Sequence, residues 1–243
     1  MTTQKSLSVI VPLYNKEVFI ESTLDNISQL LNSVDYEIIV IENGSTDNSK
    51  IVLENYIISR NNIRVKSITS KKGLGHALSA GIKASKKDFI MCIPADFTTG
   101  VSEIEYFLAN SNYQYVIGSR TISEGISREK NRLFVSSILR LLNRIFLNIR
   151  IKDTQFTFII ENSLANELIL NCKSGGFYIS AELIYFALKK GIKIIEIPVV
   201  LMDDERNKTT IKFFRDSLSV VFDIIRIFRS NGRLKNWKNF KIV

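Results

Sequence analysis

Polar side chains follow two apolar segments near the start of the chain. The segment 7–13 is typical of a strand and precedes Tyr14, while the segment 36–42 ends in Glu42 and runs into Asn43. Because the carboxyl ends of parallel strands meet at one edge of a sheet, where α/β proteins bind nucleotides, we place the candidate site there. An aromatic ring can stack on a base, and a carboxylate can accept from ribose hydroxyls or base N–H groups.

A further carboxylate follows another apolar strand. Asp96 comes after the segment 88–93, in the sequence Pro94-Ala95-Asp96. Mg²⁺ and Mn²⁺ are hard cations that prefer oxygen ligands, and either would offset negative charge on a departing diphosphate. The same carboxylate could instead cap the turn or helix that follows it. The pattern therefore predicts a metal ligand, with a purely structural role as the alternative.

These residues need a sheet that brings several strand ends together. Short apolar runs alternate with helical periodicity in the first half, which predicts an α/β protein with a mostly parallel sheet and helices on both faces. Strands are expected at 7–13, 36–42, 63–68, 88–93 and 114–118, and helices at 17–31, 47–59, 75–86 and 101–109.

The second half of the chain adds longer helical patterns. Two of them, 131–149 and 209–229, have a wide apolar face, so they either pack in the protein or lie on a bilayer with basic residues near anionic headgroups. We expect one domain at 1–208 and an amphipathic helical appendage with a basic tail at 209–243. Further elements are expected as strands at 156–160 and at 193–201, which Pro198 interrupts as at a strand end or an edge, and as a helix at 178–190.

Composition limits the partners. The 243 residues carry a net charge of +9, which suits nucleotide phosphates or an anionic membrane surface. Nucleic acid is not expected, since no aromatic and basic platform is present. Cys92 and Cys172 are far apart, and the chain has one histidine, so neither a disulfide framework nor a Cys/His metal cluster is predicted.

The location of the protein is also constrained by the sequence. The residues 1–6 are polar, so no signal peptide is expected. No apolar stretch reaches the roughly 18–20 residues of a membrane span. We expect a cytoplasmic protein that is peripheral at the cytoplasmic face of a membrane.

Several motifs, taken in order, resemble those of the family 2 glycosyltransferases, which have the GT-A fold. Within that family the chain is most similar to the dolichyl-phosphate mannose synthase and polyprenyl-phosphate hexose synthase group. The resemblance covers about residues 6–210. The motifs are Val11-Pro-Leu-Tyr-Asn-Lys-Glu17, Ile41-Glu-Asn-Gly-Ser-Thr-Asp47, Lys72-Gly-Leu-Gly75 with Gly81, Pro94-Ala-Asp96, Gly118-Ser-Arg120, Asp153-Thr-Gln155, and Glu182 ahead of Glu196-Ile-Pro198.

The resemblance implies a function and a role for each motif. It implies transfer of a hexose, with inversion, from a nucleotide-diphosphate sugar (GDP-mannose or UDP-glucose type) to polyprenyl or dolichyl phosphate. Asp96 would bind Mg²⁺ or Mn²⁺, and Arg120 and Arg128 would steady phosphates. Asp153 would be catalytic on the acceptor side. The remaining implied residues are Pro12, Tyr14, Glu17, Glu42, Asp47 and Gly73 for the nucleotide, and Gln155, Glu182 and Arg206 for the acceptor.

The chain departs from the family pattern at three places. Pro94 stands where the family commonly has the first Asp of Asp-x-Asp, and Asn43 stands where it has a second Asp. The segment Arg206-Asn-Lys-Thr209 lacks a family glycine. The first two changes remove negative charge near the diphosphate, so they could weaken metal affinity, alter base preference or mark a degenerate site.

Two further functions stay open at this point. A phosphate acceptor is already anionic and needs cations to hold it, whereas a sugar hydroxyl needs a general base, for which Asp153 is the candidate. Transfer to a hydroxyl of a growing surface glycan is therefore the first alternative. The second is a catalytically weakened nucleotide-sugar-binding partner of a membrane protein, which the missing carboxylate at Pro94 favours.

Overall fold

The computed structural model describes residues 5–60, 64–120, 130–154, 157–200 and 213–230. By its contacts the chain divides into two compact units, each made of two segments. Unit 1 comprises Met1–Ile126 and Asp153–Lys208, and unit 2 comprises Ser127–Lys152 and Thr209–Val243. The expected helical appendage 209–243 thus shares its unit with an earlier segment, and a domain boundary after residue 208 stays a prediction.

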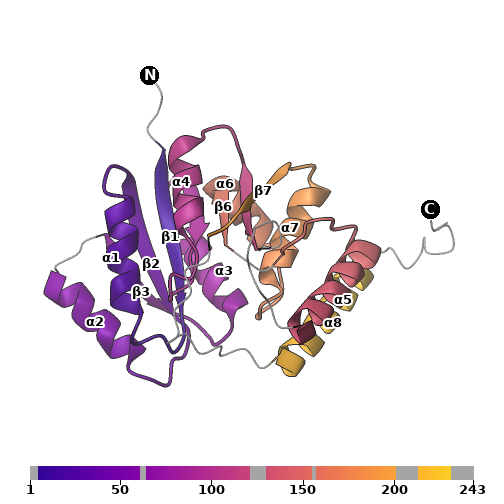
Figure 1. Ribbon diagram of the computed structural model, residues 1–243, viewed down its shortest axis with the longest axis horizontal. Helices are drawn as coiled ribbons and strands as arrows, with labels where there is room; N and C mark the ends of the chain where they lie inside the picture. Colours follow the sequence, from indigo (N-terminus) through magenta and orange to yellow (C-terminus); the bar gives the residue numbers. More distant parts are fainter. Residues whose placement is uncertain (1–4, 61–63, 121–129, 155–156, 201–212, 231–243) are drawn as a thin grey trace. The chain divides into compact units, whose positions relative to one another are not determined.

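Unit 1 is built on a seven-stranded sheet in the order β3-β2-β1-β4-β6-β5-β7 (Figure 1). The pairs β1–β2, β2–β3, β1–β4 and β5–β7 are parallel, and β6 is antiparallel to both of its neighbours. This confirms the predicted mostly parallel sheet. The strands are β1 Ser6–Leu13, β2 Asp35–Glu42, β3 Val65–Thr69, β4 Phe89–Cys92, β5 Tyr115–Ser119, β6 Phe158–Glu161 and β7 Ile194–Pro198.

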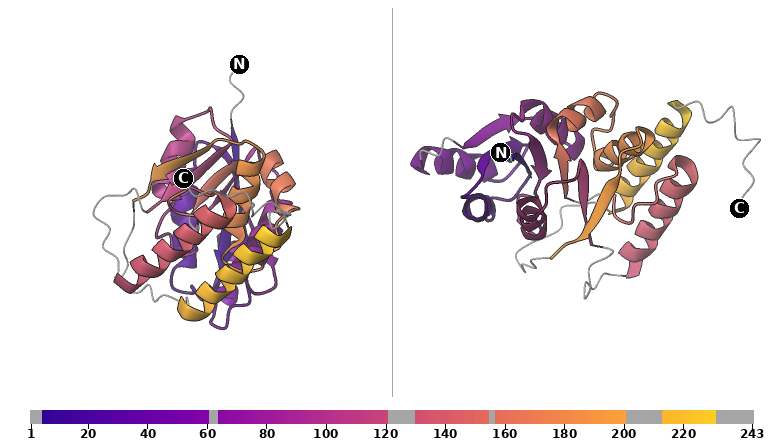
Figure 2. Two further views of the ribbon diagram at one scale, coloured as in Figure 1. Left: turned by 90° about the vertical axis from the view of Figure 1, so that its right-hand side faces the viewer. Right: turned by 90° about the horizontal axis from the view of Figure 1, so that it is seen from above.

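Helices cover both faces of this sheet, as the apolar strands require (Figure 2). On one face, alternate residues of β1 such as Leu7 and Val9 join a buried cluster with side chains of α1, α2 and α4. On the other face α3, α6 and α7 pack together, and α3 approaches β1 closely, because a Cβ at Gly81 would lie 2.6 Å from Ile10 Cγ2. The helices are α1 Ile20–Leu30, α2 Ser49–Arg60, α3 Leu74–Ala84, α4 Val101–Ala109, α6 Asn162–Ile169 and α7 Ile179–Lys189.

The strand order creates a crevice at one edge of the sheet. After β3 the chain returns to the opposite side of β1 to form β4, so β1 and β4 flank a topological switch point, where open α/β sheets bind ligands. Since β6 is antiparallel to both β4 and β5, the strand β5 runs in the same direction as β4. The residues after β1, β2, β4 and β5, and those before β6, therefore meet at the same edge.

Three element predictions needed correction. The helix α1 begins at Ile20 rather than at 17, because Phe19 and Ile20 both donate to Lys16 O and make a turn first. The helix α6 was not predicted, although its buried Leu164, Ala165, Leu168 and Ile169 have helical spacing. The last strand ends at Pro198 instead of 201, and it is an edge strand, as the proline suggested.

Unit 2 contains the helices α5 (Lys130–Leu147) and α8 (Phe213–Ser230), which contact each other through Phe146 and Phe228 with ring centroids 5.2 Å apart. The polar residue Asn143 on α5 is buried, with 3% of its surface exposed. Its burial follows from the side of the helix that is covered, since Leu147, one turn later, is buried too. None of the described helices is long and apolar enough to cross a bilayer.

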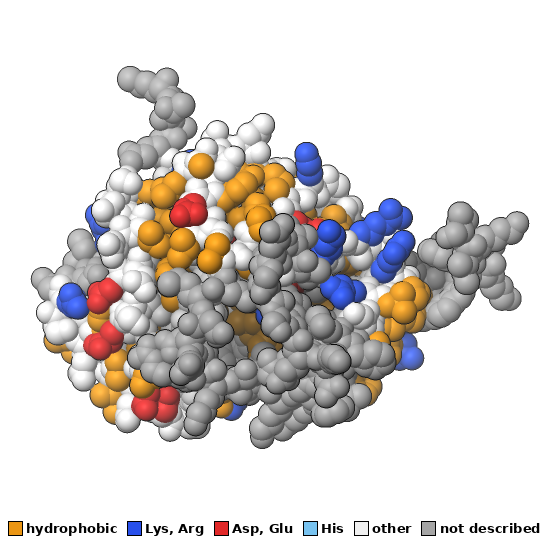
Figure 3. Space-filling view, viewed as in Figure 1, with side chains coloured by type: hydrophobic (Ala, Val, Ile, Leu, Met, Phe, Trp, Pro, Cys, Tyr) orange, Lys and Arg blue, Asp and Glu red, His pale blue; other side chains and the backbone are white. Residues whose placement is uncertain are grey.

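An apolar stripe remains exposed on α5. Ile138, Leu141 and Ile145 are 40%, 55% and 57% exposed, and their spacing of three and four residues places them on one face. Arg144 is exposed beside them, and Figure 3 shows Lys and Arg side chains close to apolar ones where α5 lies. A helix with this pattern is typical of an interface, either with a bilayer or with another protein.

A buried carboxylic acid joins α4 to the strands β5 and β6. Glu103 is 0% exposed, its Oε2 accepts the Gly100 N–H at 3.1 Å, and the Thr157 hydroxyl donates to its Oε1. Burial raises the pKa of Glu103 from 4.5 to about 7, although the backbone N–H of Gly100 acts in the opposite direction. Glu103 therefore holds its proton in the folded protein over a pH range in which the unfolded chain loses it.

We expect this residue to make stability depend on pH. Because the pKa is raised on folding, the free energy of unfolding should fall as the pH rises from 4.5 to about 7, and level off above that value. In Glu103→Gln, whose amide oxygen can accept the Gly100 N–H and whose amide nitrogen can donate to Thr157 Oγ1, this fall should be smaller by about 3 kcal/mol. Urea unfolding of both proteins at several pH values measures the difference. Parallel stability curves for the two proteins would contradict the assignment.

Candidate functional site

The loop after β1 is hydrogen-bonded to the loop after β2. Asn15 Oδ1 accepts the Thr46 N–H at 2.7 Å, and the Asn15 N–H donates to Ser45 Oγ at 3.2 Å. The Lys16 N–H donates to Ser49 Oγ at 2.8 Å. Asn15 has a φ of 51°, a conformation that asparagine adopts more readily than most residues. The two motifs that the sequence analysis singled out thus form one connected structure at the strand ends.

Two of the predicted nucleotide-binding carboxylates take part in this connection. The Glu17 N–H donates to Asp47 Oδ2 at 3.2 Å, and the Asn48 N–H donates to Glu17 Oε2 at 2.7 Å. Asp47 Oδ1 accepts the Ser49 N–H at 3.0 Å, at the start of α2. Burial alone would raise the pKa of Asp47, but hydrogen bonds from Ser49 and Glu17 outweigh it and hold this pKa below its ordinary value. A nucleotide contact by Glu17 or Asp47 stays a prediction.

Asn43 fixes the loop between β3 and α3. Its Oδ1 accepts the Gly73 N–H at 2.6 Å, while its Nδ2 donates to Gly73 O at 3.0 Å and to Ser70 Oγ at 3.0 Å. Next to it, Glu42 is 5% exposed and its Oε1 accepts the Ser45 N–H at 2.6 Å. An aspartate at position 43 has no Nδ2 hydrogens to donate. The departure from the family pattern at Asn43 therefore has a structural function in this chain.

We expect Asn43→Asp to damage the site, although it restores the residue that is common in the family. A carboxylate at position 43 would lose the hydrogen bond to Gly73 O and place a negative charge against that carbonyl oxygen, at a cost of about 1–3 kcal/mol. The free energy of unfolding should fall by about that amount, and nucleotide affinity should fall with it. Chemical denaturation and calorimetry with UDP measure the two effects. Asn110→Asp, at the exposed end of α4, is the control. Unchanged stability in Asn43→Asp would disprove this role.

Tyr14 also meets the loop 70–73 between β3 and α3, the glycine loop, at this edge. Lys72 Nζ donates to Tyr14 Oη at 2.6 Å and lies 4.3 Å from the centre of the Tyr14 ring. Gly73 has a φ of 127°, and a Cβ there would lie 2.2 Å from Gly175 O, so only glycine fits. Pro12 is half-buried near the end of β1. These predicted nucleotide-binding residues are brought together at the crevice.

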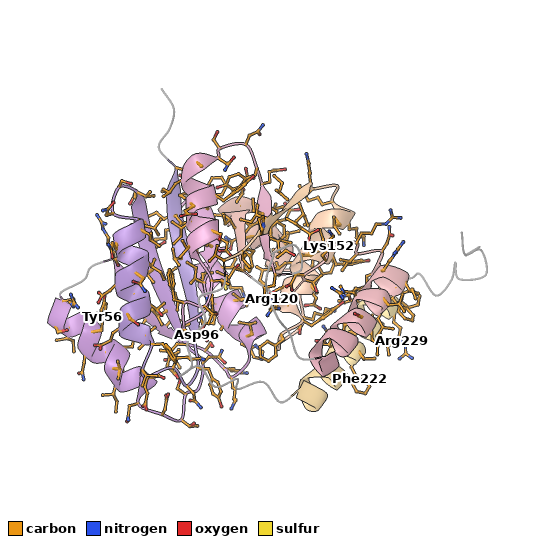
Figure 4. The ribbon with its side chains drawn as sticks, in the orientation of Figure 1. Tyr56, Asp96, Arg120, Lys152, Phe222 and Arg229 are labelled. Carbon is orange, nitrogen blue, oxygen red and sulfur yellow. The ribbon has the colours of Figure 1, made fainter. Side chains whose placement is uncertain are left out.

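Asp96 follows β4 and faces a cation from the β1 loop. Its Oδ2 lies 2.8 Å from Lys16 Nζ, and its Oδ1 accepts the Thr98 hydroxyl at 3.0 Å. The side chains of Lys16 and Asp96 are 14% and 12% exposed. No role was predicted for Lys16, although its position inside the Val11–Glu17 motif was the available signal. Figure 4 shows Asp96 below the strands of unit 1 in that view.

The residues around Asp96 fit a divalent cation only in part. One carboxylate together with substrate phosphates is a common arrangement for Mg²⁺. In the part of the chain that the structure describes, no three His, Cys, Asp or Glu side chains gather as a metal site. Pro94 has no side-chain ligand to offer. The donor set therefore suits a cation that is shared with a bound diphosphate rather than one held by protein alone.

Arg120 and Asp153 form an ion pair at the same edge. Arg120 follows β5, and its Nε donates to Asp153 Oδ2 at 3.1 Å. Asp153 is 8% exposed and precedes β6, whose antiparallel direction brings it here. In Figure 4 Arg120, like Asp96, lies beyond the lower ends of the strands. The candidate base thus already balances a guanidinium charge.

A third loop is held by Glu182 on α7. This carboxylate is 1% exposed, and its Oε2 accepts the N–H groups of Lys173 at 2.9 Å and Ser174 at 2.8 Å. The neighbouring Gly175 O accepts the Gly75 N–H at 3.0 Å, which joins this loop to the glycine loop. The predicted role of Glu182 on the acceptor side stays a prediction.

Three other predicted site residues, Arg128, Gln155 and Arg206, lie outside the described residues.

The fold and this edge define a class of protein: an open α/β protein with a topological switch point, the place where folds of this class bind nucleotides and similar ligands. Residues 8–167, about two thirds of the chain, match the family Glycosyl transferase family 2. The chain belongs to the family 2 glycosyltransferases and is a hexosyltransferase, as the motifs predicted.

Similar proteins support this assignment. The dolichyl-phosphate beta-glucosyltransferase of Dictyostelium discoideum is 29% identical, over 96% of this chain and 76% of that protein. The dolichyl-phosphate beta-glucosyltransferase ALG5D of Trichomonas vaginalis (strain ATCC PRA-98 / G3) is 28% identical, over 92% of this chain and 73% of that protein. The chain is thus distantly similar to enzymes of the polyprenyl-phosphate hexose synthase type.

Solved structures confirm the predicted GT-A fold. Glucosyl-3-phosphoglycerate synthase from Mycobacterium tuberculosis in complex with UDP matches with a TM-score of 0.67 and 22% identity, over 92% of this chain and 80% of that chain. The same enzyme in complex with Mn²⁺, UDP and phosphoglyceric acid matches with a TM-score of 0.67 and 19% identity, over 92% and 78% of the two chains.

Proposed function

We propose that the protein transfers glucose, with inversion, from UDP-glucose to a polyprenyl or dolichyl phosphate at the cytoplasmic face of a membrane. The names of its relatives support the choice of glucose and of the lipid phosphate. The observation that carries the proposal is the Arg120 guanidinium, held by Asp153 at the same strand edge as Asp96. This arrangement supports the proposal, because a fixed cation and the carboxylate paired with it lie at the strand edge to which the donor is assigned.

The donor is assigned to the crevice between β1 and β4. Tyr14 and Glu42 would contact the base and ribose, and Pro12, Glu17, Asp47 and Gly73 would line or support that pocket. Asp96 would hold Mg²⁺ or Mn²⁺ against the diphosphate, and this cation would stabilise the negative charge of the departing UDP. A structure similar in fold contains Mn²⁺ together with UDP, which is consistent with this assignment.

The acceptor is assigned to the side of Arg120. A phosphate monoester attacks the anomeric carbon without first losing a proton to a base, so its main need is cations that hold it in line with the donor. Arg120 would supply one of them, with Arg128 and Arg206 as further candidates. Asp153, which pairs with Arg120, would act as a positioning residue for its guanidinium.

The membrane is the second partner in this proposal. A polyprenyl phosphate is held in a bilayer, so the enzyme has to approach its surface. The exposed stripe of Ile138, Leu141 and Ile145 on α5, with Arg144 beside it, suits insertion at the boundary between headgroups and acyl chains.

Two measurements test the function. Thermal unfolding with UDP-glucose or GDP-mannose, with and without Mn²⁺, should show the largest rise in melting temperature for UDP-glucose with Mn²⁺. Transfer from radiolabelled UDP-glucose should then place the label in an organic extract when dolichyl phosphate is supplied. A label that stays in water with a glycan acceptor would indicate transfer to a hydroxyl instead. Donor binding without any transfer would indicate the nucleotide-sugar-binding partner.

A further inference from the structure

The Lys16 ammonium occupies one oxygen of the carboxylate to which a metal is assigned. Lys16 Nζ lies 2.8 Å from Asp96 Oδ2, and both side chains are mostly buried. The other carboxylate oxygen is the acceptor of the Thr98 hydroxyl at 3.0 Å. In the absence of nucleotide, the negative charge of Asp96 is therefore balanced by a cation that belongs to the chain itself.

The position of this ammonium is set by several contacts. The Lys16 N–H donates to Ser49 Oγ at 2.8 Å, which ties the residue to the loop after β2. Its Nζ also lies 5.3 Å from the centre of the Phe19 ring, and Phe19 is 5% exposed. Lys16 is thus held near Asp96 by the same hydrogen bonds that join the two nucleotide-side loops.

A divalent cation and this ammonium compete for one carboxylate. A divalent cation held by Asp96 would lie beside the Lys16 ammonium, which is 2.8 Å from Asp96 Oδ2, and the two positive charges would repel each other. Pro94 provides no second carboxylate to offset the extra positive charge. A diphosphate would offset it, since its oxygens can bind both the metal and the lysine.

We propose that Lys16 makes metal binding depend on nucleotide: it excludes the divalent cation from Asp96 in the empty site and admits it together with the diphosphate. This proposal rests on the proposed function for its nucleotide. It adds a role for Lys16 as the residue that sets the order of binding, with the metal entering as its nucleotide complex.

Direct Mn²⁺ binding tests the proposal without any transfer assay. Free Mn²⁺ is measured by electron paramagnetic resonance for the full chain and for Lys16→Met, each with and without UDP. The unchanged protein should bind Mn²⁺ at least about tenfold more tightly when UDP is present, whereas Lys16→Met should bind Mn²⁺ without UDP about tenfold more tightly than the unchanged protein. Lys16→Gln, which keeps a hydrogen-bond donor but not the charge, should behave like Lys16→Met.

Three controls keep the outcome specific. Lys50→Met removes an exposed lysine that pairs with Glu54 on α2, and it should leave Mn²⁺ binding unchanged. Adding Asp96→Asn to Lys16→Met should abolish the gain, because the competition takes place at that carboxylate. Thermal unfolding of each variant verifies that it is folded before binding is compared.

The result that overturns the proposal is equal Mn²⁺ affinity of the unchanged protein and both Lys16 variants without UDP. A gain that persists when Asp96 is removed would overturn it as well. If UDP does not bind but the Lys16 variants still gain Mn²⁺ affinity through Asp96, then the exclusion by Lys16 stands and the proposed donor is wrong. The failure of the two proposals is therefore distinguishable.

Discussion

Replacing Asp96 by asparagine should reduce transfer by about a hundredfold or more, mostly in kcat, while the protein stays folded. The amide keeps the size of the side chain and an oxygen for the Thr98 hydroxyl, but it loses the charge that holds a cation against the leaving diphosphate. Steady-state rates with saturating UDP-glucose and dolichyl phosphate, measured over a range of Mn²⁺ concentrations, give the effect.

The matched control for this variant is Asp88→Asn. Asp88 accepts the Ser6 hydroxyl at 2.8 Å at the opposite end of β1, far from the carboxyl edge of the sheet. Its replacement removes the same charge from the same sheet, and transfer should remain close to that of the unchanged enzyme. Undiminished turnover in Asp96→Asn would remove Asp96 from the reaction and leave its contacts with Lys16 and Thr98 as its whole function.

Arg120→Met and Asp153→Asn should differ in a way that identifies the acceptor. If the acceptor is a phosphate, Arg120→Met should lose about 10²–10³-fold in kcat/KM for dolichyl phosphate, because a fixed cation is removed from the reacting anion. Asp153→Asn should lose less, about tenfold, because the amide can still contact Arg120 while the guanidinium is held less firmly. The KM for UDP-glucose should change little in both variants.

The dependence of the rate on pH distinguishes transfer to a phosphate held by Arg120 from transfer to a hydroxyl with Asp153 as general base. If Asp153 were a general base for a hydroxyl acceptor, Asp153→Asn would lose about 10²–10⁴-fold in kcat and the acidic limb of the pH profile would disappear. Arg60→Met is a suitable control, since Arg60 makes an exposed ion pair with Asp25 on α1. A larger loss in Asp153→Asn than in Arg120→Met would favour transfer to a hydroxyl.

Much of the fold follows from local patterns. The strand ends that carry Tyr14, Glu42 and Asp96 were predicted because apolar runs and the polar residues after them are adjacent in the sequence. The antiparallel direction of β6 was not predicted, since it depends on which strands pair rather than on its own residues. The helix α6 follows β6 directly, without an intervening loop, and it was missed for that reason.

The sequence predicts which residues belong to the site, but it does not predict which of them contact one another. The contact between Lys16 and Asp96 joins loops that are far apart in the chain, and its geometry is set by the pairing of β1 with β4. Asn43 was expected to change the charge near the diphosphate, yet its amide bonds to the glycine loop, because that loop passes the end of β2. The roles of Lys16 and Asn43 depend on which loops the tertiary structure brings together, and residue type alone does not predict this.

Unit 2 is made of two segments that are far apart in the chain, and this affects the order in which the chain can fold during translation. The helix α5 leaves the ribosome well before α8, because β6, α6, α7 and β7 lie between them in the chain. Until α8 has been synthesised, Phe146 has no Phe228 to pack against, and the face of α5 that contacts α8 stays exposed. A nascent chain in this state would bind a chaperone or a nearby membrane surface. The synthesis of α8 therefore decides when that face of the earlier helix is covered.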